Sequence, residues 1–233
     1  MNVWIGTSGF QYPEWKGGFY PADLAASKML PYYAERFNST ESNYSFRRIP
    51  SVSTIEKWSA ATPAAFRFSF KAPQKVTHFS RLGDCADTLE FFGKVLAAGG
   101  EKKGPVLFQL PPNFKKDAEK LRKFLPQMPA GMQAAFEYRH ESWFDEETYE
   151  ILREAGAALC IAEDEELATP AVSTGPFGYL RLRREDYTPA DIKRWADYVQ
   201  SQAGVWSDVY IYFKHEETGV GPKFAAQMQK ALG

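Results

Sequence analysis

Eight short apolar runs alternate with amphipathic segments along the chain, and this alternation constrains the fold more than any other feature. Apolar runs of about four to eight residues have the length of buried strands. Alternating strands and helices build a parallel sheet, so eight units favour a closed TIM-type (β/α)8 barrel over an open doubly wound sheet. The predicted strands cover residues 3–6, 39–43, 66–71, 105–110, 133–138, 157–162, 178–183 and 209–213.

Local signals refine this α/β assignment. An open dinucleotide-binding sheet would show G-x-G-x-x-G after its first strand, but the chain has Gly6 and Gly9 without the third glycine. Ser53-x-x-Glu56 has capping-box spacing, and Thr188 precedes a proline at the first position of a predicted helix. Residues 163–177 lack helical periodicity, so the barrel is expected to be irregular after strand six. No linker or repeat divides the chain, and residues 1–233 are interpreted as one domain.

Composition limits the classes of function. Of 233 residues, 44% are hydrophobic and 24% are charged, as in globular proteins. A net charge of −1 disfavours non-specific binding to nucleic acid. Cys85 and Cys160 lack metal-ligand spacing and are expected to be reduced. The sequence has neither a signal-peptide pattern nor an apolar run of about 20 residues, which predicts a cytoplasmic protein without membrane contact.

Polar residues recur near the carboxyl ends of the predicted strands, where TIM barrels carry their active sites. At strand parity these side chains would share the inner face. Buried charges are costly unless they are paired or bind a ligand, so the pattern predicts a site. Five cations against two anions predict a small anionic ligand, such as a phosphate or a carboxylate. The residues are Glu41, Asn43, Lys71, Gln109, Glu137, Arg139, Arg181, Arg183 and Lys214.

Catalytic roles follow from these residue types. Glu41 and Glu137 are the candidate general base and acid, because carboxylates beside different cations acquire different pKa values. Lys71 and Arg181 would stabilise negative charge. An ion-pair network that only closes the barrel is the alternative reading. No metal is predicted, because His78, His140 and His215 occur singly and no H-x-H or H-E-x-x-H motif is present. Nothing identifies a cofactor or an oligomeric state.

Two loop features leave both a structural and a functional reading open. Tyr12, Trp15, Phe19 and Tyr20 crowd the loop after strand one, where aromatic rings either stack on a sugar or base or pack over the barrel. Trp143 lies after strand five, and the same two readings apply to it. The glycine-containing segment 219–223 opens the last helix and could hold a phosphate or simply turn the chain. Ser8 and Ser142 lie outside G-x-S-x-G, which argues against a serine hydrolase.

Several motifs together resemble the domain of unknown function 72 family, the YecE-like proteins. They run in order over most of the chain: Gly6-Thr7-Ser8-Gly9-Phe10, Glu41-x-Asn43-x-Ser45-Phe46, Phe70-Lys71-Ala72-Pro73, Leu107-Phe108-Gln109-Leu110-Pro111-Pro112, and Phe136-Glu137-Tyr138-Arg139-His140 followed by Ser142-Trp143.

The resemblance implies a TIM-type barrel and no defined reaction. Matched by position, it implies functional roles for Glu41, Asn43, Lys71, Gln109, Glu137, Arg139 and Arg181, with His78 and His140 in loops. This chain departs from the family pattern at Arg47 and at Arg183-Arg184, where relatives carry an aromatic residue and His-Gly. These departures would add positive charge at the mouth of the barrel.

The sequence thus predicts an enzyme that performs acid/base chemistry on a small anionic metabolite, phosphorylated or acidic and sugar-like. Two alternatives remain. One is a nucleic-acid phosphodiester hydrolase that uses basic and aromatic residues as a stacking platform, which the net charge disfavours. The other is a non-enzymatic module that binds an anion or a partner.

Overall fold

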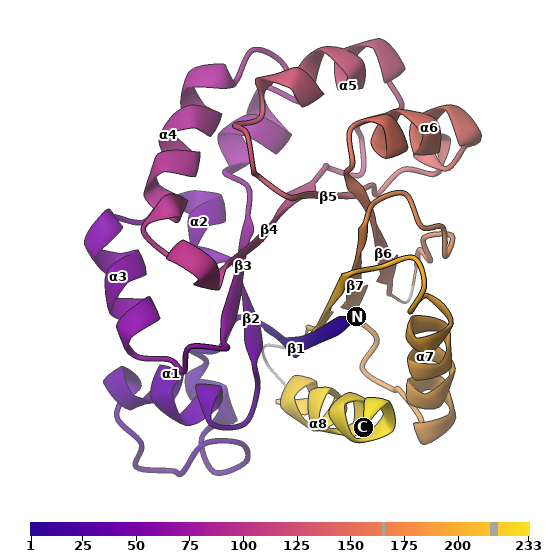
Figure 1. The fold of residues 1–233 in the computed structure, drawn as a ribbon. Coiled ribbons are helices and arrows are strands. Elements are labelled where there is room, and N and C mark those ends of the chain that lie inside the picture. The colour runs from indigo at the N-terminus through magenta and orange to yellow at the C-terminus, as the bar shows by residue number, and fades with distance from the viewer. Residues whose placement is uncertain (165, 215–218) are drawn as a thin grey trace.

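Eight parallel strands close into a barrel in the order β1-β2-β3-β4-β5-β6-β7-β8, and β8 pairs with β1. The computed structural model describes residues 1–164, 166–214 and 219–233. Figure 1 looks along the barrel from the end where β1 begins, with the helices forming an outer ring. The α/β barrel predicted from the alternating pattern is therefore confirmed.

Each strand begins and ends within two residues of its predicted limits. The strands are β1 (Asn2–Ser8), β2 (Ser39–Ser42), β3 (Arg67–Lys71), β4 (Lys103–Gln109), β5 (Ala134–Glu137), β6 (Ala158–Glu163), β7 (Phe177–Leu182) and β8 (Asp208–Phe213). The helices are α1 (Ala26–Ala34), α2 (Tyr44–Arg47), α3 (Val52–Ala60), α4 (Ala86–Ala97), α5 (Ala118–Phe124), α6 (Glu146–Glu154), α7 (Pro189–Ser201) and α8 (Val220–Leu232), together with a π-helical turn η2 (Lys75–Phe79).

Helix starts agree with the sequence in one case and differ in the other. Thr188 and Asp191 form the capping box at the start of α7, as predicted. The Ser53-Glu56 box is wrong, because α3 begins two residues earlier than it predicts, and Ser51 is the N-cap residue that accepts the hydrogen bond from the backbone of Thr54. Between β6 and β7 the described residues contain no helix, as the irregular composition of that segment predicts.

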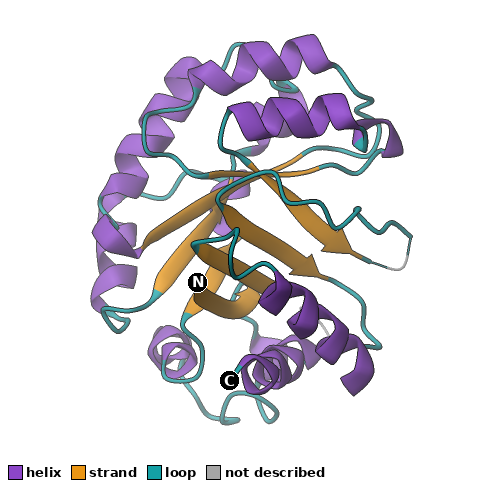
Figure 2. Ribbon diagram, turned by 45° about the vertical axis from the view of Figure 1, so that its right-hand side comes forward, coloured by secondary structure: helices purple, strands orange, loops and turns teal. Residues whose placement is uncertain are grey.

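Alternating strand residues divide the core into two layers. Outward side chains such as Phe68, Phe108 and Phe136 pack with the helices in the larger cluster. Inward side chains such as Leu107, Cys160 and Tyr179 form a second cluster inside the barrel. Figure 2 shows this arrangement, with the strands enclosed by helices. The interior is thus a packed column. In barrels of this kind the active site lies where this column ends, at the carboxyl ends of the strands.

The interior column becomes more polar toward the carboxyl ends of the strands. Near the opposite end, Trp4 and Tyr210 stack on each other. One layer further, the Tyr212 hydroxyl lies 2.6 Å from Ser39 Oγ and 2.7 Å from Ser69 Oγ. These hydroxyl groups satisfy one another, so the charged layer above them rests on a hydrogen-bonded floor.

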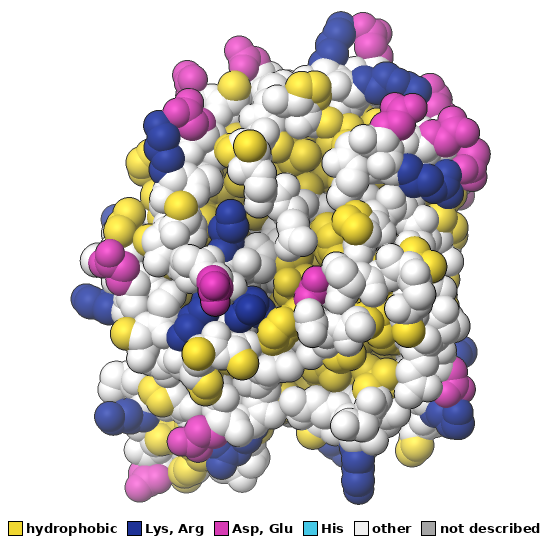
Figure 3. Space-filling view, viewed as in Figure 1, with side chains coloured by type: hydrophobic (Ala, Val, Ile, Leu, Met, Phe, Trp, Pro, Cys, Tyr) yellow, Lys and Arg dark blue, Asp and Glu magenta, His cyan; other side chains and the backbone are white. Residues whose placement is uncertain are grey.

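The two ends of the barrel carry different kinds of side chains. Figure 3 shows this face, where charged side chains lie mostly along the outer edge and hydrophobic ones are visible nearer the centre. In barrels of this kind this end serves stability, whereas the candidate site lies at the other. Within the described ranges, every helix is too short or too polar to cross a membrane.

Gly6 is required for the close contact between β1 and β2. A Cβ atom at this position would lie 1.8 Å from the carbonyl oxygen of Ser39 and 2.5 Å from the hydroxyl of Tyr33. We expect Gly6→Ala to lower the free energy of unfolding by about 1–3 kcal/mol or more, because backbone must move to admit the methyl group. Urea denaturation measures this change.

Gly204→Ala is the matched control, since a Cβ atom there meets nothing within 4 Å. Equal stability of the two variants would contradict the predicted clash in the barrel wall.

Candidate active site

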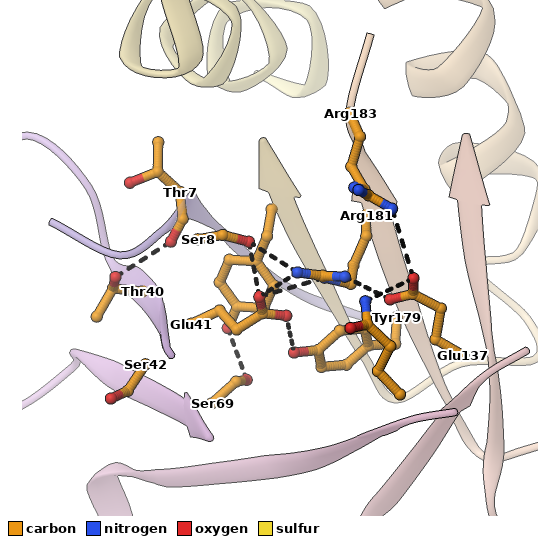
Figure 4. Close-up of polar contacts among 12 residues, drawn as sticks. Thr7, Ser8, Thr40, Glu41, Ser42, Ser69, Glu137, Tyr179, Arg181 and Arg183 are labelled. Carbon is orange, nitrogen blue, oxygen red and sulfur yellow. Dashed lines mark hydrogen bonds and ion pairs between the residues drawn. The ribbon is translucent and has the colours of Figure 1, made fainter. Parts of the chain in front are cut away.

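Arg181 lies at the centre of the polar layer and bridges the two glutamates. It projects inward from β7, and its side chain is 2% exposed. Its Nη2 donates to Glu41 Oε1 at 2.9 Å, and its Nη1 donates to Glu137 Oε2. Figure 4 shows the guanidinium group between the carboxylates of β2 and β5. We call Glu41, Arg181 and Glu137 the ion-pair network.

Glu137 is held in its ionised form. Gln109 Nε2 donates to Glu137 Oε1 at 2.8 Å, Arg139 Nε donates to the same oxygen at 3.2 Å, and Arg183 Nη1 lies 3.7 Å from it. Burial alone would raise the pKa of Glu137, but the guanidinium groups of Arg181, Arg139 and Arg183 outweigh burial and lower the pKa to about 2. Glu137 therefore cannot take the general-acid role that the sequence allowed for one of the two glutamates.

Glu41 is satisfied by two neutral donors as well as by Arg181. Ser8 Oγ donates to Glu41 Oε1 at 2.6 Å, and the Tyr179 hydroxyl donates to Oε2 at 2.7 Å. Sequence reasoning missed both donors and considered Ser8 as a nucleophile, which it argued against. Two signals were present: Tyr179 precedes Arg181 by two residues on the same strand face, and Ser8 pairs with Glu41 in the register of β1 and β2.

Lys71 is the cation that the network leaves uncompensated. It follows Ser69 on the inner face of β3, and within the described chain its ammonium group makes no ion pair. Its Nζ lies 4.0 Å from the centroid of the Phe46 ring. Burial and the charge of Arg181 lower the pKa of Lys71 to about 8, although Glu137 and Glu41 act in the opposite direction. A proton on this amine is therefore easily lost near neutral pH.

A cavity of about 340 Å³ opens beside the network. Arg183 Nη1 donates to Asp164 Oδ2 at 3.0 Å on its wall, but the buried Nε of Arg183 has no hydrogen-bond partner. The side chain of Arg139, 28% exposed, also borders this space. Donors that remain available on both guanidinium groups can receive an anion. The lining residues are Pro112, Arg139, Asp164, Glu166, Leu167 and Arg183.

The remaining predicted residues occupy different places. Asn43 lines a separate cavity of about 180 Å³ between the loops after β1 and β2, away from the arginines. His140 Nδ1 accepts from the backbone of Ser142 and begins a turn. His78 packs edge-on against Phe46 and its Nδ1 lies 2.9 Å from Thr77 Oγ1. Lys214 follows β8, and its charge acts on Lys71.

The aromatic loop residues and the glycine segment have structural roles here. Trp15 and Tyr20 are buried, and their rings stack at 6.0 Å. Trp143 is buried, stacks on Tyr138 at 4.5 Å and donates to the carbonyl of Phe114. Gly219 begins α8 with φ of 67°, a conformation that suits glycine. Among the described residues, no group of three His, Cys, Asp or Glu side chains could hold a metal ion.

Removing the central guanidinium group should destabilise the protein strongly. We expect Arg181→Met to cost about 3–5 kcal/mol of unfolding free energy, because it leaves two carboxylates buried without their cation. Arg153→Met is the control: Arg153 pairs with Glu146 at the surface, where such pairs contribute about 0–1 kcal/mol. Chemical denaturation compares the two, and equal effects would contradict a central role for Arg181.

The depressed pKa of Glu137 predicts a pH effect on stability. The pKa falls from 4.5 to about 2 on folding, so the stabilisation is complete above pH 4.5 and is lost as the pH falls towards 2. The unfolding free energy of Glu137→Gln should therefore fall less steeply with acidification than that of the wild type. The difference in slope corresponds to the uptake of up to about one proton on unfolding. Parallel curves from urea denaturation across this pH range would disprove the pairing.

Comparison with known proteins places the chain among proteins without an assigned reaction. The sequence profile described as "Protein of unknown function DUF72" matches residues 4–233. UPF0759 protein YecE of Escherichia coli K12 is 27% identical over 61% of this chain and 50% of its own length. UPF0759 protein YunF of Bacillus subtilis is 27% identical over 74% of this chain and 64% of its own length. The chain thus matches half to about two thirds of these relatives.

Solved structures agree in fold. A DUF72 family protein from Thermotoga maritima has a TM-score of 0.87 and 28% identity, covering 99% of this chain and 98% of its own. A second, from Enterococcus faecalis, has a TM-score of 0.81 and 19% identity, covering 99% of this chain and 95% of its own. With its matching profile, its barrel and these relatives, the chain belongs to the DUF72 family.

Proposed function

We propose that this protein is an enzyme that carries out acid/base chemistry on a small anionic metabolite at the carboxyl end of the barrel. The observation that carries this proposal is the charge balance at the mouth. Arg181 is paired with both buried glutamates, whereas Lys71 adds a second cation that makes no ion pair in the described chain. A partly buried ammonium group without a counter-ion is costly, and a bound anion would remove that cost.

Arg139 and Arg183, which line the neighbouring cavity, would orient this anion. Arg139 and Arg183 come from β5 and β7, so a rigid sheet fixes both guanidinium groups. Their unfilled donors suit the planar or tetrahedral oxygens of a carboxylate or phosphate. Asp164 and Glu166 on the same wall would repel a long polyanion, which favours a small ligand over nucleic acid.

Lys71 is the proposed proton-transfer group. A pKa of about 8 lies close to the operating pH, where general acids and bases are most effective. Glu137 then acts as a fixed negative charge that holds Arg181 and aligns Arg139 rather than as a proton carrier. This assignment keeps the predicted site but moves the proton from the glutamates to the lysine.

An exposed aromatic ring supports a sugar-like substrate. Phe79 at the end of η2 is 73% exposed. The preceding residue, His78, packs against Phe46, which in turn contacts Lys71. Aromatic faces at the edge of a polar site commonly stack on the apolar face of a sugar ring.

Anion binding can be measured directly with inorganic phosphate. We expect calorimetry at constant ionic strength to show one site per chain, weakened about tenfold or more by Lys71→Met and by Arg139→Met, because each removes a charged hydrogen bond. Lys193→Met is the control, since Lys193 pairs with Asp197 on exposed α7. Binding that is unchanged in Lys71→Met would overturn the assigned site.

Turnover is the second test. A panel of sugar phosphates and sugar acids, followed by NMR, should contain a substrate whose kcat/KM falls about 10²–10⁴-fold in Lys71→Met. Tight binding of such compounds without any conversion would instead identify a binding module.

A further inference from the structure

We propose that the side-chain amine of Lys71 is a nucleophile that forms a Schiff base with the aldehyde or ketone carbon of a small anionic substrate. This inference rests on the proposed function, because it uses the same anion-binding arginines. It adds the chemical class of the substrate: a carbonyl compound that carries a carboxylate or phosphate group.

The position of Lys71 suits attack on a bound carbonyl. The residue ends β3, directly above Ser69, whose hydroxyl is fixed by Tyr212 in the floor of the site. A strand end holds the amine more precisely than a loop would. Lys71 is also partly exposed, so its amine can meet a molecule that enters from solvent.

Burial is the main cause that favours the neutral, nucleophilic amine of Lys71. Arg181 on β7 and Lys214 after β8 act in the same direction, and Glu137 and Glu41, both paired with Arg181, act against it. The Phe46 ring supplies an apolar contact rather than a hydrogen-bond acceptor. A desolvated lysine beside other cations is an established arrangement for Schiff-base formation.

Lys116 shows the opposite environment within the same chain. Its ammonium group is held by Asp145 and lies 2.6 Å from Glu147 Oε2. These hydrogen bonds raise the pKa of Lys116 and keep its proton in place. Two carboxylates hold the ammonium group of Lys116, whereas Lys71 contacts the ring of Phe46. This difference in partners predicts different reactivity of the two lysines.

The step balances without an oxidant or a reductant. The nitrogen lone pair forms a bond to the carbonyl carbon, and the π electrons move to the oxygen. Transfer of a proton from nitrogen to oxygen gives a carbinolamine. The carbon–oxygen bond then breaks, the oxygen leaves as water after taking a second proton, and an iminium group remains on Lys71.

His78 can carry protons in this sequence. Its ring lies 5.0 Å from the Phe46 ring that also contacts Lys71. Burial and the charges of Lys71 and Arg139 lower the pKa of His78, so the imidazole is neutral at pH 7 and able to accept a proton. The covalent bond is thus proposed at Lys71, with His78 as the proton carrier.

Reductive trapping tests the inference on the intact wild-type protein. Glyoxylate, the probe, carries an aldehyde and a carboxylate, and sodium cyanoborohydride converts any imine irreversibly into a carboxymethyl-lysine. Peptide mass mapping after short exposure at pH 7.5 should show modification at Lys71 at least tenfold faster than at Lys116 or exposed Lys193. Phosphate should slow the reaction at Lys71, and acetaldehyde, which lacks the anion, should label it more slowly than glyoxylate.

The outcomes separate this inference from the proposed function. Preferential labelling of Lys71 that phosphate suppresses supports both. Phosphate binding by calorimetry combined with labelling of Lys71 no faster than Lys193 overturns the Schiff base but leaves the anion site.

Discussion

The burial of Arg181 between Glu41 and Glu137 is the interaction on which the rest of the site depends. Moving three charges out of water costs several kcal/mol for each ion, and only close pairing with additional hydrogen bonds offsets this cost. Ser8 on β1, Gln109 on β4 and Tyr179, which shares β7 with Arg181, supply those hydrogen bonds. The network therefore needs the barrel to be closed, because its members come from strands on different sides of the cylinder.

The network also determines what the neighbouring cations can do. Since Arg181 occupies both glutamates, Lys71 is left with an aromatic ring and a partly exposed amine. Arg139 and Arg183 lie within ion-pair distance of Glu137 and also line the adjacent cavity. On this account, a structural ion-pair network and the proposed ligand site share the mouth of the barrel.

Much of the fold could be predicted from the sequence, because the alternation of short apolar runs with amphipathic segments is a local signal that only a few architectures satisfy. Strand parity likewise placed Glu41, Glu137 and Arg181 on one inner face. The pairing among them was not predictable, since it depends on side-chain reach across the barrel. Pattern alone could not show that Glu137 is surrounded by guanidinium groups or that Lys71 is left without an anion. Asn43 followed the same strand-end pattern, yet it lines another cavity.

The protonation of Lys71 is the most direct test of this account. In protein carrying isotope-labelled lysine, an NMR titration of the side-chain signals should show Lys71 losing its proton near pH 8, well below the ordinary value of 10.5, and phosphate should shift that titration upward by favouring the charged form. A Lys71 signal that titrates at 10.5 or above and does not respond to phosphate would contradict the central claim that the mouth of the barrel holds an uncompensated cation.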